Sequence, residues 1–277
     1  MVYRAKKIAI LLIIHTFLIS TALSCIIPLV WMINSSFQTE QEFNANHGLV
    51  KTKTINIINY KKALIDEQLW LYFLNSLVYT FTTVMLIAII SSLAAYAFSR
   101  LKFPGKNVIF YLLLAAMMIP LPAGFVPIYV LLNKLHLVNR TGYILAMTNT
   151  GLSLSIYILK TFFDGLPHDY EEAARIDGCN RLQIWWHIAL PLVAPALAVV
   201  IIFNALNVWN EFVLASLIFT DNSLMPLQVG LIDIYNRNII QHTLVMAALT
   251  IATLPIVILY IKVQKQFVKG LTVGVVS

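Results

Sequence analysis

The sequence predicts an all-α integral membrane protein, and three observations lead to this prediction. Hydrophobic residues make up 60% of the 277 residues, whereas charged residues make up only 11%. The mean hydropathy of +0.82 is far above that of an ordinary soluble domain. Several apolar runs exceed the roughly 18 residues that mark a membrane-spanning helix. In lipid, such runs satisfy their backbone polar groups by forming helices.

Six apolar runs are long enough to cross a bilayer, because a helix rises about 1.5 Å per residue and a crossing takes about 20 residues. We expect these spans at about residues 8–32, 74–98, 108–132, 143–163, 195–219 and 243–263. The first run follows Arg4, Lys6 and Lys7, as a secretory signal would. It is too long for a signal, and no small-residue cleavage site follows it. We therefore expect an uncleaved anchor and a single transmembrane domain over residues 1–277.

The basic residues predict that both termini are cytoplasmic. Six spans place the termini on one side, and Lys and Arg are enriched in cytoplasmic loops. With the termini inside, twelve basic residues would be cytoplasmic and seven external. The twelve are Arg4, Lys6, Lys7, Arg100, Lys102, Lys106, Lys160, Arg175, Arg181, Lys262, Lys265 and Lys269, and the seven are Lys51, Lys53, Lys61, Lys62, Lys134, Arg140 and Arg237. The net charge of +7 thus follows from membrane orientation, and no nucleic-acid motif accompanies it.

Three prolines, Pro120, Pro122 and Pro127, interrupt the third expected span. Each removes a backbone donor and breaks the hydrogen-bond ladder of the helix. Freed carbonyls are tolerated in a membrane only where protein or a water-lined cavity covers them. We therefore expect this span to face the interior of an assembly.

The stretch from Asp169 to Pro191 lies between two expected spans but carries five charged side chains before Gly178. Its sequence, DYEEAARIDGCNRLQIWWHIALP, fits every defined position of the pattern E-A-A-x3-G-x9-I-x-L-P. This pattern resembles the EAA loop of ABC-importer permeases, the cytoplasmic loop through which the membrane subunit contacts its ATPase. The expected cytoplasmic loop, residues 164–193, is on the inner side under the orientation predicted from the basic residues.

Further stretches resemble the smaller permease subunit of maltose-type sugar transporters over most of the chain. They are Asn75-Ser76-Leu77, Ala94-Ala95-Tyr96-Ala97-Phe98-Ser99-Arg100, Phe103-Pro104-Gly105-Lys106, Met118-Ile119-Pro120, Pro127-Ile128-Tyr129, Trp209-Asn210-Glu211-Phe212 and Gln266-Phe267-Val268-Lys269-Gly270-Leu271. The resemblance implies a six-helix type I ABC importer fold in a bacterial cell membrane. It also implies a second homologous permease, two ATPase subunits that bind ATP and Mg²⁺, and an extracellular sugar-binding protein. The chain itself has no G-x4-G-K-[ST] loop for nucleotide phosphates.

The local chemistry of the loop predicts a helix, a turn and a second helix. Acidic residues in the first turn suit the positive end of a helix, and Asp169 can cap it. Gly178 permits a turn that other residues resist. We expect the second helix to start near Arg181, to bury the apolar face formed by Leu182, Trp185, Ile188 and Ala189, and to end at Pro191. By the resemblance, the coupling residues are Glu171, Glu172, Ala173, Ala174, Asp177, Gly178, Ile188, Leu190 and Pro191. Among them, Glu172 matches the glutamate that pairs with a basic residue of the ATPase.

Polar residues in the fifth expected span predict a translocation path. Asn204, Asn207 and Asn210 recur every three residues, and Glu211 follows, which places all four within about a third of a helix circumference. Such groups avoid hydrocarbon, so they face a cavity or another helix. Amides suit sugar hydroxyls, and Trp209 or Tyr129 could stack on a sugar ring. Hydrogen bonding between helices is the competing interpretation.

Other functions fit the sequence less well. An ion-coupled carrier would need titratable groups in several spans, whereas Glu211 is the one carboxylate within the expected spans. A membrane enzyme lacks support, since no catalytic or metal-binding motif occurs, and Cys25 and Cys179 form neither a disulfide framework nor a metal site. An ABC permease for a non-sugar solute remains open, because the EAA loop is common to such permeases.

Overall fold

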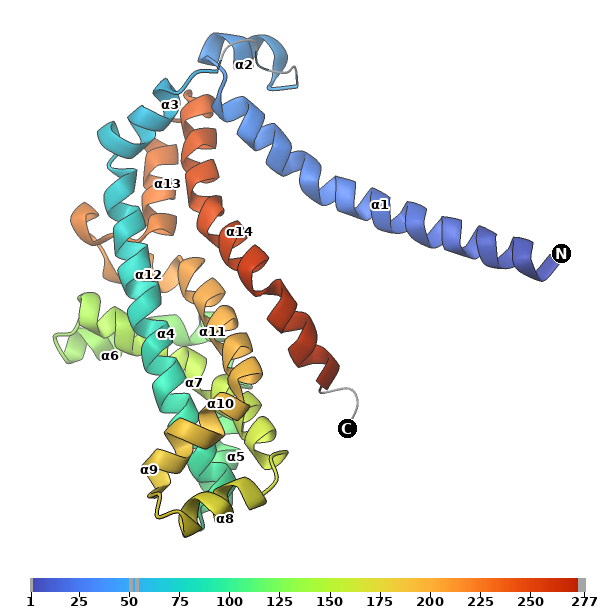
Figure 1. The fold of residues 1–277 in the computed structure, drawn as a ribbon. Coiled ribbons are helices and arrows are strands. Elements are labelled where there is room, and N and C mark those ends of the chain that lie inside the picture. Colours follow the sequence, from blue (N-terminus) through green and yellow to red (C-terminus); the bar gives the residue numbers. More distant parts are fainter. Residues whose placement is uncertain (1, 50–51, 53–54, 274–277) are drawn as a thin grey trace. The chain divides into compact units, whose positions relative to one another are not determined.

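The computed structural model describes residues 2–49, 52 and 55–273, which form helices and no strand. The predicted all-α class is confirmed. In chain order the elements, which are shown in Figure 1, are α1 (Val2–Ser36), α2 (Glu40–Asn46), α3 (Ile58–Lys61), the π-helical η1 (Lys62–Asp66), α4 (Leu69–Arg100), α5 (Lys106–Ala116), α6 (Leu121–Lys134), α7 (Arg140–Asp164), α8 (Asp169–Ile176), α9 (Arg181–Ile184), the π-helical η2 (Trp185–Ala189), α10 (Leu190–Leu192), α11 (Ala194–Trp209), α12 (Val213–Ile218), the 3₁₀ turn η3 (Asn222–Leu224), α13 (Leu227–Arg237) and α14 (His242–Val273).

Among the described residues, four helices are long and apolar enough to cross a membrane. They are Lys6–Ser36, Leu69–Arg100, Arg140–Asp164 and His242–Lys262. A fifth span results if Arg181–Leu192 and Ala194–Trp209, which are bent by 81°, are counted together. Several apolar helices of this length make the chain a multi-pass membrane protein.

The third expected span, 108–132, is wrong as a continuous helix. The chain forms α5 and α6 instead, and helical structure is interrupted between Met117 and Pro120. Pro120 has an extended backbone, with φ −64° and ψ 128°, at the start of α6. A proline ring disfavours helical geometry at the residue before it, so Ile119 cannot continue α5 into α6. The predicted break is therefore found, but it separates two helices that are each too short to span alone.

The fifth expected span, 195–219, is also wrong as one helix. The α11 helix ends at Trp209, and α12 begins only at Val213. Two side chains stabilise this break. Asn210 donates its amide to the Leu206 carbonyl, and Glu211 accepts hydrogen bonds from the first turn of α12.

The chain divides into two compact units, each of which is described by itself. The first comprises Met1–Trp70 with Leu231–Leu254. Within it, the Glu40 carboxylate accepts hydrogen bonds from the backbone N–H groups of His242 and Thr243, both at 3.1 Å, and so caps the start of α14.

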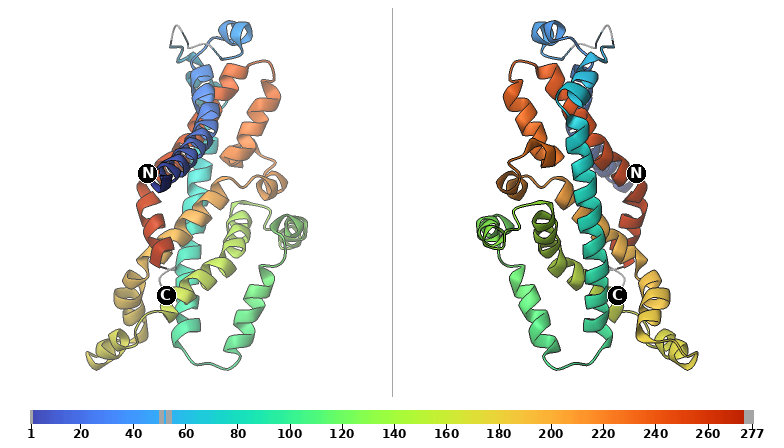
Figure 2. Two further views of the ribbon diagram at one scale, coloured as in Figure 1. Left: turned by 90° about the vertical axis from the view of Figure 1, so that its right-hand side faces the viewer. Right: turned by 90° about the vertical axis from the view of Figure 1, so that its left-hand side faces the viewer.

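The second unit comprises Leu71–Gly230 with Pro255–Ser277 and contains the expected coupling loop. One of its apolar clusters joins the C-terminal half of α4 to α7, η2 and α11, and includes Ala95, Phe163, Trp185 and Ala196. In Figure 2 the chain turns after α4 and runs back as α5, and Phe98 and Phe110 keep the two helices in contact near the turn, with ring centroids 5.5 Å apart.

A second cluster in this unit holds α6, α7 and α12 against the N-terminal half of α4. Tyr79 and Phe219 stack with their rings 5.3 Å apart and only 3° from parallel. Tyr143 contacts both rings. The two clusters thus fix opposite parts of α4, and the coupling loop packs on the first of them.

Candidate coupling site between α7 and α11

The expected coupling loop forms helices in the predicted order. Asp169, Glu171 and Glu172 lie in the first turn of α8, where negative charges interact favourably with the positive end of the helix dipole. The expected cap was Asp169, which is wrong, because the residue before the helix is His168 and it makes no side-chain cap. Asp169 lies instead within the first turn, where its negative charge is favourable.

The turn after α8 depends on Gly178. Its φ of +86° lies in the left-handed region, which residues with a Cβ rarely adopt. Nothing lies within 4 Å of the position that a Cβ would occupy. The requirement for glycine is therefore one of backbone geometry and not of space.

The second helix starts with a capping box. The Asn180 side chain accepts from the Gln183 backbone N–H, and the Gln183 side chain accepts from the Asn180 N–H, at 3.0 and 2.8 Å. This arrangement satisfies two donors at the start of α9. A π-helical turn, η2, follows just before Pro191, where proline prevents regular helical bonding.

The apolar face of the second helix differs in part from the prediction. Trp185 and Ala189 are buried as expected, but Leu182 is 66% exposed and Ile184 is fully buried in its place. The remaining predicted positions are Ile188 and Leu190, which are half-buried, and Pro191, which is exposed. Pro191 lies within α10, so the helix ends one residue later than expected.

The two sides of α8 have different surroundings. Glu171 and Ala174 are buried, at 4% and 5% exposure. The opposite surface, which we call the outer face of α8, consists of Tyr170, Glu172, Ala173, Ile176 and Asp177, all exposed. Of the two alanines among the predicted coupling residues, Ala173 is therefore exposed on this face, whereas Ala174 packs in the core.

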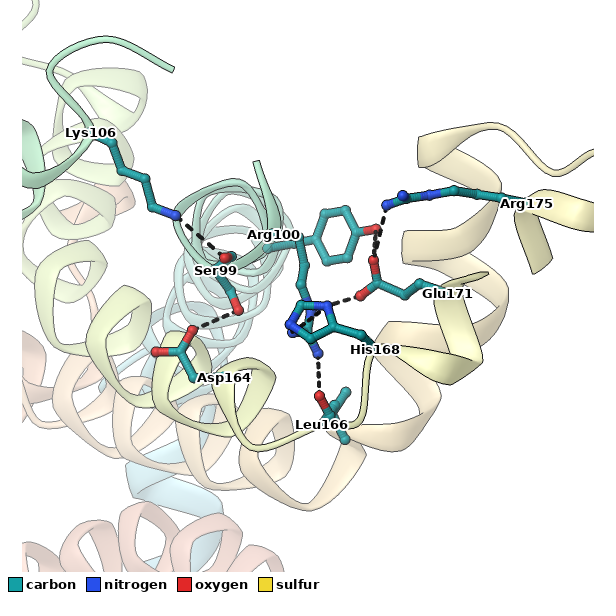
Figure 3. A network of polar contacts seen from close by, with 9 residues as sticks. Ser99, Arg100, Lys106, Asp164, Leu166, His168, Glu171 and Arg175 are labelled. Atoms are coloured by element: carbon teal, nitrogen blue, oxygen red, sulfur yellow. Dashed lines mark hydrogen bonds and ion pairs between the residues drawn. The ribbon is translucent and has the colours of Figure 1, made fainter. Parts of the chain in front are cut away.

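The buried Glu171 belongs to a polar network at the end of α4, shown in Figure 3. Its Oε1 forms an ion pair of 2.7 Å with Arg100 Nε. Its Oε2 accepts a hydrogen bond of 3.2 Å from the Tyr96 hydroxyl and lies 3.6 Å from Arg175 Nη2. Glu171, which is also among the predicted coupling residues, is thus buried in contacts within the chain, whereas Glu172 is exposed.

Further polar contacts join the end of α7 and the α4–α5 turn to the end of α4. Ser99 donates to Asp164 Oδ1 at 2.7 Å, and Lys160 pairs with Asp164 Oδ2 at 2.6 Å. The Lys106 ammonium group donates to the carbonyls of Ser99 and Leu101, which lie on either side of the last residue of α4. A cation at a helix C-terminus is favourable there.

These pairs change the charge that the loop presents. The loop carries five acidic residues against Arg175 and Arg181. Of the five, Asp164 and Glu171 are paired within the chain. The exposed acidic groups that form no ion pair among the described residues are Asp169, Glu172 and Asp177, which lie on α8 or directly after it.

The predicted path residues do not lie together. Asn204 is buried, and its amide donates to the Ser155 hydroxyl of α7 at 2.9 Å. Trp209 is buried beside Phe73, whereas Asn207 and Asn210 are exposed.

Two more predicted path residues lie outside α11. Tyr129 of α6 is half-buried against the second cluster. Glu211 lies beyond the end of α11, and its carboxylate accepts from the backbone N–H groups of Leu214 and Ala215, at 2.6 and 3.0 Å. The Tyr143 hydroxyl also donates to Glu211, at 3.2 Å.

The start of α4 binds the segment before α13. The Asn75 amide donates to the carbonyls of Ser223 and Met225, at 2.9 and 3.0 Å. The Ser76 hydroxyl accepts from the Leu227 N–H at 2.7 Å. In this segment the Ser223 N–H donates to Asp221 and lowers the pKa of that carboxyl group.

The reasoning from sequence missed Tyr96, Arg100 and His168 as members of the site. A signal was present, since Tyr96 and Arg100 are four residues apart and so share one face of α4. A tyrosine and an arginine on one face near the end of an apolar helix indicate a polar contact. The partner across the chain, Glu171, could not be identified from spacing alone.

Comparison with known proteins identifies the family of this chain. Residues 87–273 match the model of the family described as binding-protein-dependent transport system inner membrane component. This chain belongs to that family. The resemblance to sugar ABC-importer permeases is thereby confirmed.

Individual relatives cover nearly the whole chain. The diacetylchitobiose uptake system permease NgcG of Streptomyces coelicolor is 30% identical over 94% of this chain and 87% of its own length. The arabinooligosaccharides transport system permease AraQ of Halalkalibacterium halodurans is 32% identical over 91% of both. A crystal structure of a bacterial ABC transporter involved in the import of alginate contains a chain with a TM-score of 0.81 and 26% identity, covering 91% of this chain and 95% of that one.

Proposed function

We propose that this protein is the translocation-pore subunit of a binding-protein-dependent ABC importer for sugars in a bacterial cell membrane. The observation that carries the proposal is the α8–Gly178–α9 loop, which fits every position of the EAA pattern on a chain of this family. The loop exposes one face of α8, as a docking element must. Both termini would be cytoplasmic, with α5 and α6 forming the third of six crossings and α11 and α12 the fifth.

The names of the relatives support a sugar as the transported solute. The permeases NgcG and AraQ are named for diacetylchitobiose and arabinooligosaccharides, and the structural relative for alginate. All three names refer to carbohydrates of two or more units. A disaccharide or oligosaccharide is therefore the proposed substrate class.

The proposed assembly contains four further subunits. They are a second homologous permease, two ATPase subunits that bind ATP and Mg²⁺, and an extracellular sugar-binding protein. The family description, which names a binding-protein-dependent system, supports the last of these. Hydrolysis would occur on the ATPases, and this chain would transmit it to the pore.

The outer face of α8 is the proposed docking surface for the ATPase. Glu172 would pair with a basic group there, while Ala173 leaves room for close approach and Ile176, 86% exposed, supplies apolar area. Asp177 and Gly178 set the turn that follows. Ile188, Leu190 and Pro191 would hold the second helix under the membrane domain.

The proposed path residues are those with free surface. Asn207 and Asn210 are exposed and carry both donors and acceptors for hydroxyl groups. Tyr129, which is half-buried, remains a candidate for stacking on a sugar ring, whereas Trp209 is buried beside Phe73 and has little surface to offer. Asn204 and Glu211 bond within the chain, and their proposed role is to hold the helices that border the path.

Transport in proteoliposomes tests the proposal. The complex would be purified with its neighbouring subunits, loaded with ATP inside, and supplied outside with binding protein and radiolabelled oligosaccharide. Uptake that requires ATP and persists with a protonophore is the expected result. Uptake driven by an ion gradient without ATP would instead indicate a carrier.

A charge reversal on the outer face of α8 gives a second arm. Glu172→Lys is expected to abolish ATP-dependent uptake while the protein still inserts in the membrane. Asp66→Lys is the matched control, because Asp66 is an exposed acid on a segment expected outside the cell. Equal uptake by both variants would contradict the coupling role.

A further inference from the structure

The Arg100 guanidinium contacts two residues of the short segment before α8 and one residue in the first turn of α8. Its Nη2 donates to the Leu166 carbonyl at 2.7 Å, and its Nη1 lies 3.1 Å from His168 Nε2. Its Nε pairs with Glu171 Oε1 at 2.7 Å. One side chain at the end of α4 therefore contacts Leu166 in the loop before α8, His168 directly before the helix, and Glu171 in the first turn of α8 (Figure 3).

Residues of this chain are sufficient to bury the Arg100–Glu171 ion pair, without a partner subunit. The Arg100 and Glu171 side chains are 3% and 5% exposed. A buried ion pair is tolerated when further hydrogen bonds satisfy both groups. Here the Leu166 carbonyl accepts from Arg100 Nη2, and the Tyr96 hydroxyl donates to the second carboxylate oxygen of Glu171. Arg100 Nε and Glu171 Oε1 are held by their ion pair alone, and together these buried contacts favour one arrangement of α4 and α8.

The neighbouring glutamate has the opposite surroundings. Glu172 is exposed and forms no ion pair among the residues that the structure describes. Successive residues of a helix point about 100° apart, so two adjacent acids can serve two different surfaces. Glu171 faces α4, and Glu172 faces the solvent-exposed side.

The chain segment that joins α7 to α8 does not by itself fix the orientation of α8. Only residues 165–168, including Gly165 and Pro167, lie between α7 and α8. Ala174 packs in the core, but a methyl group alone does not set the rotation of a helix about its axis. The polar contacts of Glu171 supply that orientation.

We propose that Arg100 and Glu171 are positioning residues that tie the coupling helix α8 to α4. Through this tie, a displacement of α8 passes to the end of a membrane-spanning helix and is not absorbed in the loop at 165–168. The inference rests on the proposed function of α8. It assigns the two adjacent acids separate roles, Glu171 in transmission within the chain and Glu172 in docking to the ATPase.

Two matched variants in the complete complex test this assignment. Glu171→Gln keeps the shape of the side chain and removes its charge, and Glu172→Gln does the same at the adjacent exposed position. Two quantities are measured, namely the amount of ATPase that copurifies and the stimulation of ATP hydrolysis by sugar-loaded binding protein. Glu171→Gln should retain the ATPase and lose stimulation about tenfold, within the usual range for coupling between sites. Glu172→Gln should lose ATPase retention.

A charge exchange separates positioning from general stability. Arg100→Glu alone should lose stimulation, and combining it with Glu171→Arg should restore part of it, because the opposite charges face each other again. No recovery in the double variant, at equal membrane abundance, would overturn the proposal. So would wild-type stimulation in Glu171→Gln, or a loss of ATPase from that variant equal to that from Glu172→Gln.

Arg100→Lys covers the case in which Glu171→Gln fails to accumulate. Lysine keeps the charge, so Glu171 stays paired, but it cannot contact Leu166 and His168 at the same time. Its stimulation should fall while its abundance is unchanged, and full stimulation would overturn the tie. If the wild-type complex retains no ATPase at all, the proposed function itself fails, which is a distinct result.

Discussion

Gly151 of α7 lies so close to Asn204 of α11 that a methyl group at Gly151 would overlap the Asn204 side-chain oxygen. The same methyl group would come within 2.6 Å of Ile87 of α4. Three membrane helices therefore meet at this glycine. The Asn204 amide donates to Ser155, whose hydroxyl donates to the Gly151 carbonyl at 2.6 Å, so a small residue and a polar contact act together.

Gly151→Ala should destabilise this contact. Overpacking of a close helix contact costs about 1–3 kcal/mol, and it should lower the thermal unfolding midpoint of the purified complex. Gly124→Ala is the control, because the nearest atom to its added Cβ, in Ile128, is 3.9 Å away. Equal midpoints for the two variants would contradict the close approach of α7 and α11.

The turn at Gly178 should discriminate between residues by backbone geometry. Gly178→Val should impair stimulation of ATP hydrolysis by the loaded binding protein, because a β-branched residue is strongly disfavoured at φ +86°. Gly178→Asn should retain most of the stimulation, since asparagine tolerates left-handed geometry. Since the space around Gly178 is open, both proteins should reach the membrane at normal abundance. Lower stimulation in Gly178→Asn than in Gly178→Val would contradict the requirement for left-handed backbone geometry at this position.

Glu211 should be more important for stability than the adjacent Asn210. Glu211→Ala removes the acceptor for the Leu214 and Ala215 N–H groups, and leaving buried donors without a partner costs about 1–3 kcal/mol each. Thermal unfolding should occur at a lower temperature in this variant, and Glu211→Gln should recover part of the loss. Asn210→Ala, at an exposed position, serves as the comparison and should leave the midpoint nearly unchanged. A larger effect at Asn210 would refute the capping role.

Asn75 should hold the segment before α13 in place. Asn75→Asp has nearly the same shape but cannot donate to the Ser223 and Met225 carbonyls. Losing about 1 kcal/mol of local stability should accelerate amide hydrogen exchange over residues 221–227 several-fold. Asn207→Asp, a change at an exposed position, should not alter exchange in that segment. Equal protection in both variants would place the anchor elsewhere.

Much of the fold was predictable because it depends on local patterns. The apolar runs predicted the long helices α1, α4, α7 and α14, and their apolar windows satisfy the length and composition of membrane spans. The turn at Gly178 followed from a residue type with a distinct backbone preference. These features depend on composition and on short-range geometry.

The errors have physical causes that sequence periodicity does not contain. In the third expected span the prolines predicted a break but not its extent, since the chain leaves helical geometry between Met117 and Pro120. The fifth expected span is predicted as a single helix, whereas Glu211 caps the start of a separate helix, α12. Both breaks lie within long, mainly apolar segments, so the length of an apolar run alone could not locate them. Only the position of α12 shows that backbone N–H groups lie within reach of the Glu211 carboxylate, which accepts hydrogen bonds from them.

The site was predicted in outline, and its internal contacts were not. The EAA pattern identified the loop but not which of its residues face inward. Glu171 and Glu172 have the same chemistry and adjacent positions, and they are distinguished only by Arg100, 71 positions earlier in the chain than Glu171. A long-range ion pair of this kind needs the tertiary structure.

Cysteine accessibility at α8 tests the central claim most directly, namely that its outer face docks on a cytoplasmic ATPase. In a background where Cys25 and Cys179 are replaced by serine, Ile176→Cys places a thiol at a position that is 86% exposed, and Ala174→Cys places one that is 5% exposed. The account predicts that the thiol at 176 crosslinks to the ATPase in the assembled complex and is not labelled by an impermeant reagent added outside intact cells. The thiol at 174 should neither crosslink nor be labelled, because it is buried. Labelling of position 176 from the cell exterior, without any crosslink to a nucleotide-binding subunit, would contradict the account.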